Sequence, residues 1–198
     1  MTIRPAAIAA LALTALLALS GCAGDTGTDN GMVGMDHDRS SAPAMTADAN
    51  DADIMFARMM KEHHAQAVEM SDVLLSKDGV DDRVVSLAED IKAAQEPEMR
   101  TMDQWLRRWG TDPHSMDGMD HGSGMMSDED MRALDEASGA DAGRLFLQQM
   151  IRHHEGAVDM AQDEVDNGQN RDAVALAETI IEAQTEEIAT MKEILATL

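Results

Sequence analysis

The chain has 198 residues, 44% of them hydrophobic, which is enough for one folded domain with tails, and its formal net charge at pH 7 is −23. So large a negative charge argues against nucleic acid as a partner, because the phosphates would be repelled. Two Phe, two Trp and no Tyr leave eighteen Met to help fill a core, and the single Cys excludes an internal disulfide.

The first residues have the pattern of an export signal. Arg4 precedes an apolar run over residues 6–19 that is too short to span a bilayer. The sequence LSGC at 19–22 resembles the bacterial lipoprotein signal, in which the Cys is acylated and becomes the first mature residue. We therefore expect a signal peptide over 1–21 and a lipid on Cys22 that anchors the protein to the cell membrane. The alternative is an ordinary cleaved signal peptide that happens to contain a Cys.

A flexible tether and a helical hairpin are expected next. Residues 22–50 are rich in Gly, Asp, Ser and Thr and show no apolar periodicity, as in a linker. Residues 51–77 place apolar side chains at steps of three and four, which predicts a helix capped by Asn50 or Asp51. A second helix of the same kind is expected from about 82 to 108.

The second half of the folded part is expected to be another helical hairpin. Residues 110–126 form a loop by their Gly, Pro and Asp content, and the pair Ser127/Asp130 predicts a short helix over about 128–137. Two long amphipathic stretches then follow, near 141–167 and 171–197. With no strand signal, the pattern predicts an all-α, ferritin-like four-helix bundle whose hairpins are joined by one long crossover.

The two hairpins are copies of one another. Residues 60–70 and 150–160 are identical at six of eleven positions, and residues 87–102 match 176–191 at nine of sixteen. A period of about ninety residues in two copies is too long for a solenoid of short repeats. We therefore expect one domain over 51–198, with halves at 51–109 and 141–198 and a Met/His-rich connection over 110–140.

Each copy carries a His pair flanked by methionines. Residues three, four and seven apart share one face of a helix, so these side chains should lie near one another. Thioether and imidazole are ligands that Cu(I) prefers, whereas hard iron centres in bundles use carboxylates. The alternative is that the His are hydrogen-bonded core residues and the Met fill space. The candidate copper ligands are Met60, His63, His64, Met70, Met150, His153, His154 and Met160.

His63 and His153 fall on the apolar stripes, whereas His64 and His154 lie at the stripe edges and could equally face water. The partner helices carry polar residues at equivalent places. We expect them either to hold imidazole N–H groups behind a metal or to form buried polar pairs that join helices. These residues are Gln95, Glu98, Gln184 and Glu187.

The loops carry a second Met/His signal. Met119 and His121 lie in the connection, within the sequence MDGMDH, and a similar MDH stands at 35–37. A Gly-rich polar loop has no core for a Met to fill, so these residues are further candidate ligands for Cu(I) or Ag(I). MDGMDH also resembles repeats of bacterial periplasmic copper-resistance proteins.

The full pattern resembles domain-of-unknown-function family 305. Phe, four residues, Met, two residues, His-His, then Ala-Val and Met, followed by Leu-Ala, Ile, Ala-Gln, Glu and Met, occurs in both halves over about 51–198. The resemblance implies an exported ferritin-like protein, and some members bind copper through Met and His. It extends the candidate site on the partner helices to Met102 and Met191.

From the sequence we expect a lipid-anchored, extracytoplasmic protein that sequesters or transfers Cu(I), with Ag(I) and Cu(II) as alternatives. Its partners would be the membrane, copper ions and another copper-handling protein, and we expect no catalytic turnover. The alternatives are a ferritin-like or hemerythrin-like metal oxidase and a metal-free helical interaction module. The oxidase is disfavoured because Met60 and Met150 stand where di-iron bundles place the Glu of Glu-x-x-His.

Overall fold

The protein is a helical bundle in which the two hairpins pack against each other. The computed structural model describes residues 48–112 and 124–198, and within them it contains helices but no strand. The predicted fold class and all five predicted helices are confirmed, with ends that differ from the predicted ones by no more than about two residues. The helices are α1 (Asp51–Leu75), α2 (Asp82–Arg108), α3 (Asp128–Glu136), α4 (Gly139–Asn167) and α5 (Arg171–Leu195).

Helix starts follow the capping signals in the sequence. The Asn50 side chain accepts from the Asp53 backbone N–H, and the Asp53 carboxylate accepts from the Asn50 N–H. Ser127 and Asp130 form the same reciprocal arrangement at α3. Each capping box satisfies two backbone donors that a helix start would otherwise leave without partners.

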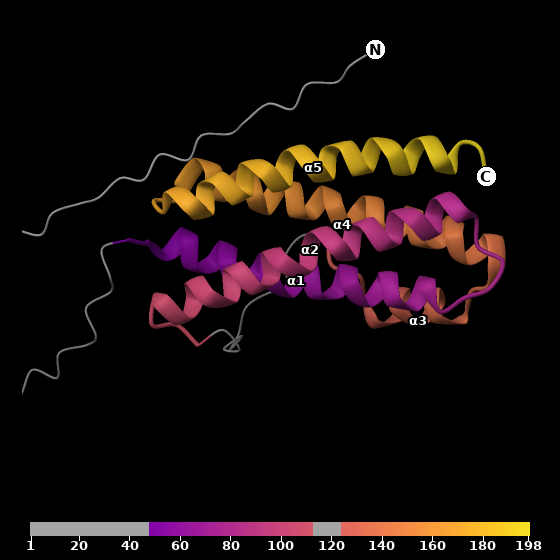
Figure 1. Ribbon diagram of the computed structural model, residues 1–198, viewed down its shortest axis with the longest axis horizontal. Helices are drawn as coiled ribbons and strands as arrows, with labels where there is room; N and C mark the ends of the chain where they lie inside the picture. The colour runs from indigo at the N-terminus through magenta and orange to yellow at the C-terminus, as the bar shows by residue number, and fades with distance from the viewer. Residues whose placement is uncertain (1–47, 113–123) are drawn as a thin grey trace, which may run out of the picture. The chain divides into compact units, whose positions relative to one another are not determined.

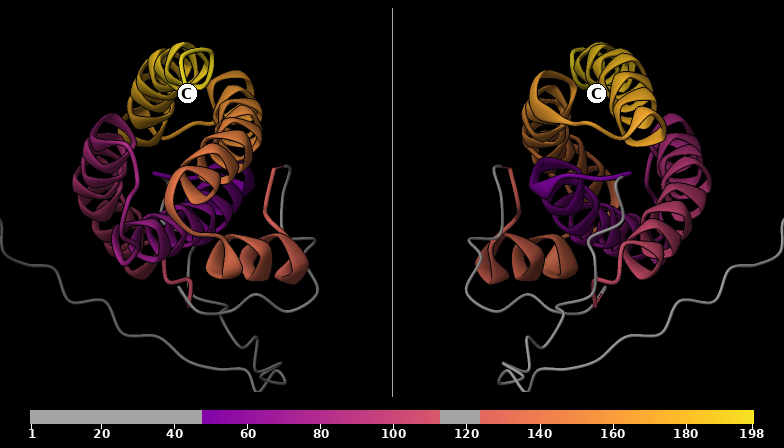
Figure 2. Two further views of the ribbon diagram at one scale, coloured as in Figure 1. Left: turned by 90° about the vertical axis from the view of Figure 1, so that its right-hand side faces the viewer. Right: turned by 90° about the vertical axis from the view of Figure 1, so that its left-hand side faces the viewer.

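The long helices surround one core (Figures 1 and 2). Helices α1 and α2 form one hairpin and α4 and α5 the other, and α1 packs against α4. The chain leaves α2 at one end of the bundle and enters α4 at the other, where Gly139 lies beside Gly79 of the α1–α2 turn (Figure 1). This long connection is the predicted crossover, and α3 lies within it against α1 and α4.

The core consists of two apolar clusters, one toward each end of the bundle. The cluster at the α3 end contains Phe146, Leu147 and Ile91, and the opposite cluster contains Phe56, Trp105 and Ile180. All four aromatic residues of the chain are buried. Because the chain has so few aromatic residues, flexible thioether side chains fill much of the remaining core volume. Buried methionines are Met60, Met70, Met102, Met126, Met150 and Met191.

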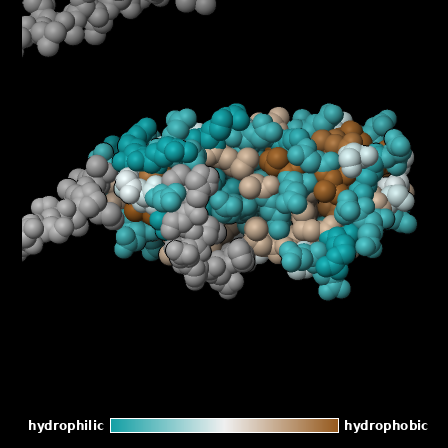
Figure 3. Space-filling model, turned by 90° about the horizontal axis from the view of Figure 1, so that it is seen from below, coloured by the Kyte–Doolittle hydropathy of each residue, from teal (hydrophilic) through white to brown (hydrophobic). Residues whose placement is uncertain are grey.

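One face of the bundle is mostly hydrophilic (Figure 3). On the face shown in Figure 3, polar and charged residues dominate and apolar side chains show in patches between them. None of the helices within residues 48–112 and 124–198 is long and apolar enough to cross a membrane.

Two buried carboxyl groups join α1 to the turn between α4 and α5. Asp53 is fully buried, and its Oδ1 accepts from the backbone N–H groups of Gln169 and Asn170 at 3.0 and 2.8 Å. Glu164 is also buried, and its oxygens receive no hydrogen bond from a donor group among the described residues. Burial, and then the hydrogen bond and charge of Asp53, raise the pKa of Glu164 from 4.5 to about 8. At neutral pH Glu164 is therefore protonated and uncharged.

Replacing Glu164 by Gln is expected to change how stability depends on pH. The folded state holds the Glu164 proton more tightly than the unfolded state, so this stabilisation is complete below pH 4.5 and is lost as the pH rises to about 8. Relative to the parent, Glu164→Gln should gain roughly 2 to 4 kcal/mol of unfolding free energy between pH 5 and pH 8, since one pKa unit corresponds to about 1.4 kcal/mol. Urea unfolding across this range measures the difference. Glu69→Gln, at an exposed position of α1, should run parallel to the parent, and parallel curves for both variants would contradict the assignment.

Candidate metal centre

A polar layer crosses the bundle between the two apolar clusters. Each long helix passes from one cluster to the other through polar residues, so the layer lies at one level of the core. All of its imidazoles are buried, including the two whose exposure the sequence had left open. The layer contains His63 and His64 of α1, Gln95 of α2, His153 and His154 of α4, and Gln184 of α5.

Two imidazoles are held by carboxylates of the neighbouring helices. His64 Nε2 lies 2.7 Å from Glu98 Oε2, and His154 Nε2 lies 2.7 Å from Glu187 Oε2. Because a carboxylate only accepts hydrogen bonds, Nε2 of each ring carries the hydrogen and donates it. In the neutral ring this leaves the lone pair on Nδ1. Both Nδ1 atoms are buried and have no hydrogen-bond partner among the described residues.

The other two imidazoles meet at the centre of the layer. The ring centroids of His63 and His153 are 3.6 Å apart, with their planes tilted by 38°. Both nitrogens of His153 are buried without a hydrogen-bond partner in the described part of the chain. Burial, and then the neighbouring His63, His154 and His64, hold the pKa of His153 well below its usual value. His153 is therefore neutral at physiological pH, with a lone pair available to a metal ion.

A narrow cavity between α2 and α5 reaches this layer. It has a volume of about 20 Å³ and is lined by Gln95, Glu98, Gln184 and Glu187, together with small and apolar side chains. Glu98 and Glu187 are about one-fifth exposed, whereas the imidazoles that they hold are fully buried. The side-chain oxygens of Gln95 and Gln184 have no hydrogen-bond partner among the described residues. Of the four predicted supporting residues, the two glutamates contact imidazoles through hydrogen bonds.

The predicted methionine ligands occupy different environments. Met60 is buried in the cluster that contains Phe56, and Met150 in the cluster that contains Phe146, each one turn before its His pair. Met70 is buried farther along the second of these clusters, whereas its counterpart Met160 is only half-buried and lines a surface pocket. Methionines at the same position of the two repeats therefore differ in burial. Met119, His121 and Cys22 lie outside the described residues.

The donor set suits a soft metal better than a hard one. Within the described residues, no three His, Cys, Asp or Glu side chains are arranged to hold a metal ion. Besides imidazole nitrogen, the residues next to the layer offer thioether sulfur, and Met60 and Met150 are the thioethers closest in sequence to the His pairs. Such a mixed set fits Cu(I), which accepts few ligands and imposes little geometry.

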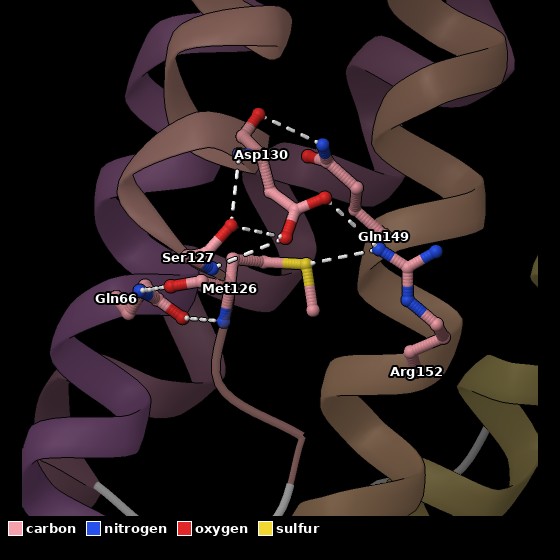
Figure 4. A network of polar contacts seen from close by, with 6 residues as sticks. All are labelled: Gln66, Met126, Ser127, Asp130, Gln149 and Arg152. Carbon is pink, nitrogen blue, oxygen red and sulfur yellow. Dashed lines mark hydrogen bonds and ion pairs between the residues drawn. The ribbon is translucent and has the colours of Figure 1, made fainter.

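Sequence reasoning missed how the connection is attached beside the layer (Figure 4). The Gln66 amide forms two hydrogen bonds with the Met126 backbone, at 2.9 and 2.7 Å. Gln149 donates to the Asp130 carbonyl, and Arg152 contacts Met126 Sδ. The one feature of the sequence that could have indicated this attachment is a difference between the two repeats. Gln66 in the first repeat corresponds to Gly156 in the second.

Glycines make this attachment possible. Gly124 has φ +87°, and a Cβ atom there would lie 2.8 Å from the Arg152 carbonyl oxygen and 2.9 Å from the Gly156 Cα. The backbone of the connection thus runs directly against α4 at the level of His153, whose carbonyl oxygen would be 3.0 Å from the same Cβ. Residue 156 thus has no side chain where the connection approaches α4, whereas its counterpart Gln66 has one.

The fold and the layer define a class of helical bundles that bury paired imidazoles between two hairpins. The family model described as "Domain of unknown function (DUF305)" matches residues 53–195, and the chain belongs to this family. The family membership that the sequence pattern indicated is thereby confirmed. No curated protein matches the chain at a significant level.

Solved structures of relatives agree with this assignment. A presumed secreted DUF305 protein from Streptomyces coelicolor shares 37% sequence identity over 74% of this chain and 93% of its own, with a TM-score of 0.69. A DUF305 fragment from Deinococcus radiodurans shares 35% identity over 76% of this chain and 99% of its own, with a TM-score of 0.69. The protein CopM in a Cu(I)-bound form shares 31% identity over 73% of this chain and 96% of its own, with a TM-score of 0.61. CopM has also been solved in Cu(II)-bound and Ag-bound forms.

Proposed function

We propose that this protein binds Cu(I) in the buried polar layer and either sequesters the ion or transfers it to another copper-handling protein. The observation that carries the proposal is the set of buried nitrogens that have no hydrogen-bond partner within residues 48–112 and 124–198: Nδ1 of His64, Nδ1 of His154 and both nitrogens of His153. Leaving a polar atom buried without a hydrogen bond costs about 1 to 3 kcal/mol. Four such nitrogens in one layer of the core therefore support a bound ligand there. The Cu- and Ag-bound forms of the relative CopM support copper as that ligand.

We propose the following ligands and supporting residues. His63, His64, His153 and His154 supply imidazole, and Met60 and Met150 supply thioether. Glu98 and Glu187 hold the rings of His64 and His154 so that Nδ1 is the free nitrogen. We also propose that the protein binds copper without turnover, because the cavity at the layer, about 20 Å³, has no room for a second substrate.

We place this activity outside the cytoplasm. The export pattern of residues 1–21 and the presumed secretion of the Streptomyces relative support this location. The proposed anchor is a lipid on Cys22, and the proposed partners are the membrane and the protein that delivers or receives copper. Membrane fractionation of the full chain tests the anchor, and recovery of all the protein in the soluble fraction would exclude it.

Anaerobic competition titration tests the copper site. The chain should bind Cu(I) far more tightly than Fe(II) or Mg(II), because its clustered donors are imidazoles and thioethers. X-ray absorption at the copper edge should find both nitrogen and sulfur bound to the ion, and Cu(I) should raise the melting temperature because it binds only the folded state. Iron binding as tight as copper binding, or copper bound by sulfur alone, would contradict the proposed layer site.

A further inference from the structure

The duplication gives the α1–α4 pair two equivalent faces, and α3 covers one of them. On the covered face, Gln149 donates to the Asp130 carbonyl, the Lys77 ammonium donates to the Asp135 carbonyl, and Leu134 of α3 is buried. Leu145 and Met70 lie beneath, packed into the core cluster at this end. Within residues 48–112 and 124–198, the structure describes no counterpart of α3 on the other face.

The open face differs from the covered face in its side chains. With the repeat offset of ninety residues, Met55 corresponds to Leu145, Met59 to Gln149 and Met160 to Met70. These three methionines line one surface pocket of about 480 Å³, with Asp51 and Asp163 among its other lining residues. Methionines of α1 and α4 therefore line one pocket on the face that corresponds to the docking site of α3.

Core packing accounts for only one of these methionines, because Met160 packs against the cluster that contains Phe56, whereas Met55 and Met59 belong to neither cluster. Met55 is 49% exposed, and it is the only large hydrophobic side chain that is exposed among the described residues. Met59 and Met160 are half-buried in the pocket wall. Exposing an apolar side chain forgoes the roughly 1.5 to 3 kcal/mol that its burial would contribute, so Met55 adds little to the stability of the core.

We propose that Met55, Met59 and Met160 form a solvent-accessible thioether site for Cu(I) or Ag(I), separate from the buried imidazole layer. Thioether sulfur is neutral and soft, so it favours these ions over hard or divalent ones. The carboxylates of Asp51 and Asp163 add negative charge at the pocket, which attracts the cation without having to bind it. An accessible site of this kind can exchange its ion with solvent or with another protein, which the buried layer cannot do directly.

Silver titration of the full chain tests this site. The variant Met55→Leu/Met59→Leu/Met160→Leu keeps the apolar volume and removes only sulfur, so it should bind one Ag(I) ion fewer per chain than the parent. The control Met99→Leu/Met131→Leu changes half-buried methionines outside the pocket and should bind as the parent does. With ¹³C-methyl methionine, the signals of residues 55, 59 and 160 should shift together as Ag(I) is added.

Two further variants separate the possible results. Met55→Leu alone changes the most exposed of the three side chains and cannot disturb the core, so it should already weaken silver binding at the pocket. His63→Leu/His153→Leu should leave the three methyl shifts intact, which distinguishes this site from the buried layer. Unchanged silver stoichiometry in the triple variant, or methyl signals that do not move with Ag(I), would overturn the proposal.

Discussion

Replacing His63 and His153 together by Leu is expected to lower Cu(I) affinity by more than about 100-fold, since losing an outer partner of a ligand alone costs about 10- to 100-fold. The same change should leave the metal-free protein as stable as the parent, or more stable. The two rings are in contact in the core, with their planes tilted, and His153 is buried without a hydrogen-bond partner among the described residues. An apolar side chain of similar size removes that cost.

A matched control uses the same layer. Gln95→Leu/Gln184→Leu also replaces two buried polar side chains by Leu but leaves every imidazole in place, so Cu(I) affinity should change only a few-fold. Competition titration and urea unfolding of both double variants, with and without copper, give the comparison. If the His variant loses more than roughly 2 kcal/mol of stability without metal while its copper affinity is unchanged, the imidazoles have a structural role and no part in a metal site.

Replacing Gly124 by Ala is expected to destabilise the protein by about 2 to 5 kcal/mol. An L-residue in the left-handed region costs roughly 1 to 2 kcal/mol, and crowding a packed site adds about 1 to 3 kcal/mol. Both costs apply at Gly124, because its φ is +87° and the new Cβ would lie under 3.0 Å from backbone atoms of Arg152 and Gly156. The close atoms belong to the helix backbone of α4, which cannot shift as easily as the end of a side chain.

Gly110 offers the matched control for this change. It also has a left-handed φ, +72°, but a Cβ there would have no atom within 4 Å. Gly110→Ala should therefore cost only the conformational part, about 1 to 2 kcal/mol. Urea unfolding of the two variants measures the difference, which reports the close approach of the connection to α4. Equal losses would show that this approach contributes nothing to stability.

Much of the fold could be predicted because its signals are local. The apolar spacing of three and four, the Ser127/Asp130 pair and the duplicated segments each concern residues within one helix or one hairpin. Hydrogen bonds and side-chain neighbours within a helix connect residues three and four apart. The helices, the α3 cap and the single crossover could therefore be placed before the helices were packed.

Packing between distant segments could not be predicted in this way. His64 and His154 stand at the edge of an apolar stripe, and only the approach of α2 and α5 buries them and brings Glu98 and Glu187 to their Nε2 atoms. The link from Asp53 to Gln169 and Asn170 joins residues 116 and 117 positions apart. The apolar periodicity of a helix cannot predict such a contact, because the contact depends on how the hairpins pack.

The sequence by itself determined the helices, the duplication and the residue types from which a metal layer can be built. Only the tertiary structure decided which of these side chains contact one another and which are buried. Met70 and Met160 hold the same place in the repeat, yet one is buried beneath the face that α3 covers and the other lines a pocket. The reason is physical: a duplicated sequence specifies equivalent local structure, but a single connecting segment can cover only one of two equivalent faces.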